Sequence, residues 1–139
     1  MNLINILALY LAIKHTAKRY HWKSVGSQYM SDHLLFDRIA DAVDEGLIDT
    51  IAEQYYMGVG RKNLNELDQL CSLAVQMEGQ VYESSDENMK LMFLELSKMM
   101  NTFLINIENI SKLRGINNTL DDMASSITQV YGLVIARLV

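Results

Sequence analysis

Residues 21–37 read HWKSVGSQYMSDHLLFD and hold two of the three histidines of the chain. His33 and Asp37 are four positions apart, so on a helix their side chains share one face. Asp49 and Glu53 repeat this spacing further along the chain. Imidazole and carboxylate groups together suit iron, zinc or manganese. The segment from His21 to Glu53 therefore predicts a metal site.

The two ligand pairs cannot meet on a single continuous helix. His33 and Asp49 are sixteen positions apart, which is roughly 24 Å along such a helix. A second chain that runs antiparallel would bring its own Asp49 and Glu53 to the histidines. If both pairs bind one centre, the spacing predicts a two-fold interface with two equivalent sites.

The types and order of these residues resemble the signature of the Dps family, the mini-ferritins that protect DNA during starvation. That signature has His-Trp, then Gly, an aromatic residue, His and Asp, and later Asp-x-x-Ala-Glu. The last part stands here as Asp49-Thr50-Ile51-Ala52-Glu53. The glycine turn of residues 58–62 and the last interhelical turn, residues 113–122, resemble the family as well. The resemblance covers nearly the whole chain from about Ile4 onward.

The resemblance implies a ferroxidase and iron-storage protein. Such a protein forms a hollow dodecamer, binds ferrous iron, oxidises it with peroxide or oxygen, and stores the ferric mineral inside. The implied iron ligands are His21, His33 and Asp37 of one chain with Asp49 and Glu53 of its two-fold mate. Trp22 lies close to the iron site in the family, although a tryptophan by itself predicts packing.

The resemblance also places the turn before the last helix at a three-fold pore. Asn117, Asn118, Asp121 and Asp122 stand there, and a ring of carboxylates would attract cations. The alternative is that these residues cap the helix, because Asn, Asp and Thr favour a first helical turn.

One spacing departs from the family pattern. The residues that match Asp37 and Asp49 are eleven positions apart in the family and twelve apart here. Each residue turns a helix by about 100°, so twelve steps leave Asp49 roughly 120° away from the face of Asp37. A π-bulge near Gly46 would absorb the extra residue. Otherwise Asp41 or Asp44 substitutes as a ligand, or the site is inactive. The alternative function is a ferritin-like structural or interaction bundle with a lost or rearranged metal site.

The apolar pattern predicts one all-α domain that spans residues 1–139. No proline interrupts the chain, and apolar residues recur at helical spacing in residues 3–20, 29–47, 89–113 and 120–138. Ser84 and Glu87 suit a capping box before the third segment. Residues 64–80 suit a shorter helix. The predicted fold is a ferritin-like four-helix bundle with a short extra helix in the crossover between the second and third long helices.

The composition of the chain predicts its cellular compartment and argues against some kinds of partner. No apolar run is long enough to span a membrane, and no basic residue precedes the apolar stretch Leu3 to Ile13, as a signal peptide requires. The lone Cys71 suits a reducing compartment, so a cytoplasmic protein is expected. The net charge of −5 repels DNA. We interpret the basic cluster of Lys14, Lys18, Arg19 and Lys23 as solubilising or interfacial.

Overall fold

The computed structural model describes residues 1–59, 61–110 and 115–139, and its regular elements in these ranges are all helical. The all-α prediction is thereby confirmed. In chain order the elements are α1 (Leu3–Trp22), α2 (Tyr29–Ala42), α3 (Glu45–Ile51), the π-helical η1 (Ala52–Val59), the 3-10 helical η2 (Arg61–Gln69), α4 (Leu70–Met77), α5 (Asp86–Ile110) and α6 (Asn117–Leu138). None of these helices is long and apolar enough to cross a bilayer.

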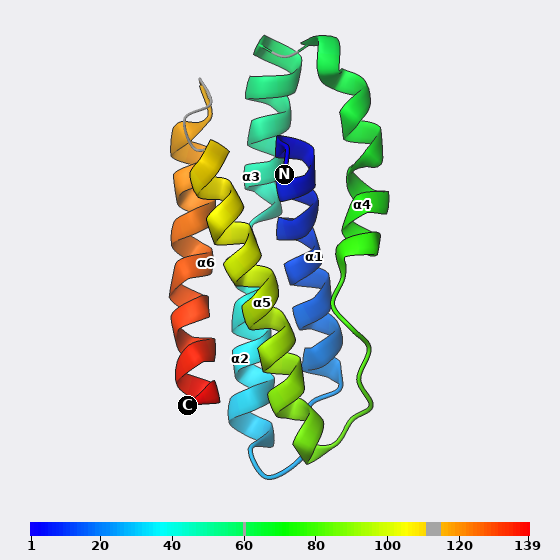
Figure 1. Ribbon diagram of the computed structural model, residues 1–139, viewed down its shortest axis with the longest axis vertical. Helices are drawn as coiled ribbons and strands as arrows, with labels where there is room; N and C mark the ends of the chain where they lie inside the picture. Colours follow the sequence, from blue (N-terminus) through cyan, green and yellow to red (C-terminus); the bar gives the residue numbers. More distant parts are fainter. Residues whose placement is uncertain (60, 111–114) are drawn as a thin grey trace.

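The long helices lie along one another, and α3 continues the direction of α2 (Figure 1). Helix α1 contacts α2, α4 and α5, while α6 contacts α2, α3 and α5. The apolar stripes face inward and form a shared core. Phe36 of α2 stacks on Phe93 of α5 with ring centroids 4.1 Å apart, and Tyr10 of α1 stacks on Phe103 at 5.3 Å. These aromatic pairs bring the first half of the chain against the second half.

The second predicted helix is interrupted. Helix α2 ends at Ala42 and α3 begins at Glu45, with Val43 and Asp44 in extended conformations. The Asp44 carboxylate accepts a hydrogen bond of 2.9 Å from the Gly46 backbone N–H, so it caps α3. The prediction of a π-bulge near Gly46 is therefore wrong in its position. The interruption precedes Gly46, and in the part of the chain that the structure describes π-helical geometry occurs only further on, in η1.

The predicted capping box of Ser84 and Glu87 is wrong by one residue. Helix α5 begins at Asp86, and the Ser85 hydroxyl accepts a hydrogen bond of 3.1 Å from the Asn88 backbone N–H. The Asn88 amide reaches back to the Glu83 carbonyl at 2.9 Å. Asn88 therefore occupies the place expected for the glutamate, but its side chain donates to a carbonyl instead of accepting from the capping residue's N–H. The predicted short helix of residues 64–80 divides into η2 and α4.

The crossover between α4 and α5 is fastened to the last turns of α1. Arg19 forms an ion pair of 3.0 Å with Glu78 and donates to the Gly79 carbonyl at 2.8 Å. The Gly79 N–H donates to the Thr16 hydroxyl at 2.9 Å. The Tyr20 hydroxyl donates to the Gln80 carbonyl. Because α1 also carries His21, these bonds help to fix the end of the helix that holds the candidate site.

Gly79→Ala should destabilise the chain by about 1–3 kcal/mol, the usual cost of overpacking. A Cβ atom at this position would lie 2.8 Å from Thr16 Cγ2 and 2.9 Å from Glu95 Cγ. Thermal unfolding should show a lower Tm. Gly132→Ala is the matched control, because nothing lies within 4 Å of its Cβ position and alanine favours a helix. A Gly79→Ala chain as stable as the wild type would contradict the close packing of the crossover.

Candidate metal centre

The two histidines of the signature lie side by side, although they come from different helices. His21 ends the last turn of α1, and His33 lies in the second turn of α2. Their rings stack with centroids 3.8 Å apart and planes inclined by 23°. The Tyr29 ring also stacks on His33, with centroids 5.0 Å apart. The turn between α1 and α2 thus places three aromatic rings in contact.

Reciprocal hydrogen bonds determine the proton positions on both imidazoles. His21 Nδ1 lies 2.9 Å from the His33 carbonyl oxygen, and His33 Nδ1 lies 3.0 Å from the His21 carbonyl oxygen. A carbonyl oxygen only accepts, so each Nδ1 must carry the proton. In the neutral rings, each Nε2 then has an available lone pair. Backbone carbonyls orient metal-binding histidines in this same way.

Asp37 follows one turn after His33 and has a weak partner. Its carboxylate lies 3.6 Å from the Lys18 ammonium, and more than a third of each side chain is exposed. Ion pairs at this degree of exposure contribute little free energy. A divalent cation could therefore displace Lys18 from Asp37. The structure places His21, His33 and Asp37 along the contact between α1 and α2.

Asp49 and Glu53 lie beyond the break between α2 and α3. Asp49 of α3 and Glu53 of η1 are both exposed. Asp49 borders a groove of about 340 Å³ that Leu11 of α1 also lines. Among the described residues, no group of three His, Cys, Asp or Glu side chains is close enough to hold a metal ion. One chain thus brings neither Asp37 nor Asp49 and Glu53 close enough to the two histidines to complete a metal centre.

The helix break places Asp37 and Asp49 beside the same stripe of α1. Lys18, which contacts Asp37, and Leu11, which shares the groove with Asp49, are seven positions apart. Seven residues make two helical turns with a residual rotation of only about 20°. The two carboxylates therefore border one partly buried stripe of α1. An uninterrupted helix would have separated them by roughly 120°.

Large apolar side chains are exposed on the segments that carry the histidines. Trp22 is 73% exposed, so the packing role predicted for it is not present within one chain. Met30 and Leu34 are 65% and 59% exposed and share one face of α2. Val81 of the crossover lines a shallow groove with Trp22. This surface suits contact with another apolar surface.

A buried ion pair beside the histidines escaped the sequence analysis. Asp32 is only 1% exposed, and Arg137 of α6 binds its carboxylate through two hydrogen bonds of 2.8 and 3.1 Å. The hydrogen bonds that Arg137 donates to the Asp32 carboxylate raise the pKa of Arg137. The available signal was the position of Asp32, four residues before the core residue Phe36. Its partner, 105 positions away, could not be identified from local spacing.

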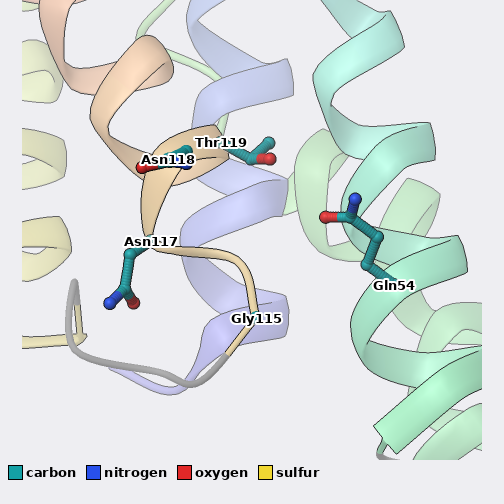
Figure 2. Close-up of a pocket in the computed structure, with 5 residues that line it drawn as sticks. All are labelled: Gln54, Gly115, Asn117, Asn118 and Thr119. Atoms are coloured by element: carbon teal, nitrogen blue, oxygen red, sulfur yellow. The ribbon is translucent and has the colours of Figure 1, made fainter.

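A polar pocket of about 350 Å³ lies between η1 and the start of α6. Figure 2 shows the Gln54 side chain of η1 opposite the first turn of α6, with Thr119 directed towards it. Among the described residues, no side chain forms a capping hydrogen bond at the beginning of α6, and the first turn of this helix contains no acidic residue. The capping alternative for Asn117 to Asp122 is therefore wrong. Asp121 and Asp122 are exposed on the following turn, while the preceding residues 111–114 lie outside the described ranges.

The comparisons with known proteins find no matching family model, no matching curated protein and no matching solved structure.

Proposed function

We propose that this chain is the subunit of a Dps-like ferroxidase and iron-storage protein. The observation that carries the proposal is the pair of reciprocal hydrogen bonds between His21 and His33. These bonds hold two imidazoles in contact and leave both Nε2 lone pairs available. A histidine pair that only filled space in the core would be buried, whereas both residues here are half-exposed.

The arrangement of the helices supports a ferritin-like four-helix bundle. Helix α1, the α2–α3 pair, α5 and α6 would be its four members, and the long connection through α4 would be its single crossover. In this fold the surface formed by α1 and α2 would meet a second copy of the chain. The exposed side chains of Trp22, Met30 and Leu34 support that contact.

The proposed site forms between two chains. His21, His33 and Asp37 of one chain would bind iron together with Asp49 and Glu53 of its two-fold mate. Imidazoles suit ferrous iron, and carboxylates favour the harder ferric product. Each ferrous ion gives up one electron, so one peroxide molecule accepts the electrons of two ferrous ions and, with two protons, leaves as two waters. The exposed Asp121 and Asp122 would provide an approach of negative potential for the cations.

Ferrous oxidation tests the proposal directly. The assembled protein, given ferrous iron under anaerobic conditions and then peroxide, should form the ferric product much faster than buffer alone. Absorbance of the ferric product follows the reaction. A rate equal to that of buffer with either peroxide or oxygen would contradict the proposed function and leave the structural or interaction bundle.

Assembly gives a second test. The chain should form oligomers at micromolar concentration, and a dodecamer of 15.9 kDa subunits would have a mass of about 190 kDa. Sedimentation velocity measures this. Leu34→Lys should weaken the association because it puts a charge at the centre of the proposed apolar contact. Ile105→Lys, at an exposed residue of α5, is the matched control and should leave the two-fold contact intact. A monodisperse wild-type monomer would remove the basis for a shared site.

A further inference from the structure

The break between α2 and α3 leaves backbone groups without helical partners, and two side chains of α1 bind them. The Tyr10 hydroxyl accepts a hydrogen bond of 2.8 Å from the Asp44 N–H and donates to the Ala42 carbonyl at 3.4 Å. The Lys14 ammonium donates to the carbonyls of Ala40 at 3.2 Å and Val43 at 3.4 Å. Tyr10 and Lys14 are one turn apart, so both reach the break from one face of α1.

The break is enclosed by the protein on the side of α1, while Asp44 itself is exposed. Tyr10 is fully buried and Val43 is 2% exposed. Buried backbone groups need partners, because water cannot replace them there. Burial also raises the pKa of Tyr10, so its hydroxyl stays protonated and continues to donate to Ala42. These contacts distinguish the break from a frayed helix end and make it a defined structure.

The break determines the direction of the carboxylates that follow it. With twelve positions between Asp37 and Asp49, a continuous helix would rotate Asp49 by roughly 120° away from Asp37. With the break, both residues border the stripe of α1 that contains Leu11 and Lys18. The side chains that stabilise the break thereby set the face on which Asp49 and Glu53 lie.

We propose that Tyr10 and Lys14 are positioning residues for the carboxylate half of the iron site. They touch neither iron nor its ligands; they hold the chain open at Val43 and Asp44 so that Asp49 and Glu53 face the partner's histidines. The inference rests on the proposed function, because it assigns a purpose to the direction of those two carboxylates. It predicts that a change at Tyr10 impairs the same half of the site as a change at Glu53, although the two residues lie on different helices.

Loss of the Tyr10 hydroxyl has two possible structural results, and both move the carboxylates. If the break persists, the Asp44 N–H and the Ala42 carbonyl lose their partner in a partly buried position, so the segment that leads into Asp49 loses an anchor and shifts. If the break closes, Val43 and Asp44 regain helical hydrogen bonds and Asp49 rotates away. A displacement of about 1 Å at a catalytic site can lower the rate about a hundredfold. Tyr10→Phe should therefore slow iron oxidation by about that factor.

Mixed assemblies test which half of the site Tyr10 serves. Each two-fold pair has two sites, and each site takes its histidines from one chain and its carboxylates from the other. Tyr10→Phe chains assembled with His33→Ala chains should regain activity, because one site combines the intact histidines of the first with the intact carboxylates of the second. Tyr10→Phe chains assembled with Glu53→Ala chains should remain inactive, because both sites then have impaired carboxylates.

Deletion of Asp44 provides an independent test. It shortens the separation of Asp37 and Asp49 to eleven positions, and eleven steps of a continuous helix return to within roughly 20°. The deletion chain should oxidise iron without the break, and adding Tyr10→Phe to it should change the rate less than twofold. Lys14→Met in the full-length chain should resemble Tyr10→Phe in the mixed assemblies.

Ser97→Ala is the control, since it removes another buried hydroxyl, one that donates to the Leu94 carbonyl at 2.7 Å within α5. It should leave iron oxidation unchanged. Tyr10→Phe assemblies that recover equally with both partners, or that oxidise iron like the wild type, would overturn the positioning role while leaving the ferroxidase proposal in place. Failure of the ferroxidase proposal would be recognised separately, by absence of oxidation in the wild-type protein, and would overturn both.

Discussion

His33→Ala and Glu53→Ala should each lower the rate of ferrous oxidation by roughly a hundredfold, since even residues that only orient metal ligands cost ten- to a hundredfold when they are changed. His33 would supply an imidazole from one chain, and Glu53 a carboxylate from the other. The helical content should not change, because one residue is half-exposed and the other is exposed. Stopped-flow absorbance gives the rate, and circular dichroism gives the helical content.

Assembling the two mutants together should restore part of the activity. In a mixed pair, one site keeps the His33 of one chain and the Glu53 of the other, while the second site lacks both. His15→Ala is the control for loss of an imidazole, because His15 is a half-buried residue of α1 that the proposed site does not use. Wild-type rates in both single mutants would refute the ligand assignment, and an absence of recovery in the mixture would refute the sharing of the site between chains.

Arg137→Met should destabilise the chain by about 3–5 kcal/mol, the usual result of removing one partner from a buried ion pair. The change leaves the Asp32 carboxylate in the interior without its two hydrogen bonds from the guanidinium. The stacking of Arg137 over Phe93, at 5.3 Å, is lost as well. Urea unfolding measures the free energy. Arg38→Met, at an exposed residue of α2, should change it by no more than about 0.5 kcal/mol.

The double change of Asp32→Leu with Arg137→Met should recover most of that stability, because an apolar pair avoids the desolvation of two charges. The contribution of the ion pair to the free energy of unfolding should not vary with pH near neutrality. Asp32 raises the pKa of Arg137 above its ordinary value, so the contribution of this cation persists below that value and is lost only as strongly alkaline pH passes through the folded-state pKa. A single Arg137→Met chain as stable as the wild type would contradict the structural importance of the pair.

The helical pattern of the chain is a local property, and it was predictable for that reason. The stripes that begin at Leu3 and Leu120 repeat every three to four residues, so the inward face of α1 and of α6 follows from neighbours within a few turns. The division of the second helix was not predictable in this way. Residues 29–47 have one apolar period, yet the Tyr10 hydroxyl and the Lys14 ammonium, from another helix, stabilise a break inside that segment.

The candidate site likewise has features that the sequence determines and features that only the tertiary structure decides. The sequence by itself determined which candidate ligand types are present, in which order, and that His33 and Asp37 share a helical face. Only the tertiary structure decided that the His21 and His33 rings stack, that each Nδ1 donates to the backbone of the other residue, and that Asp49 shares a stripe of α1 with Asp37. The contact between Asp32 and Arg137 was also decided only by the tertiary structure. The physical reason is distance: spacing along a helix orients side chains over a few turns, whereas contacts between helices depend on how the whole core packs.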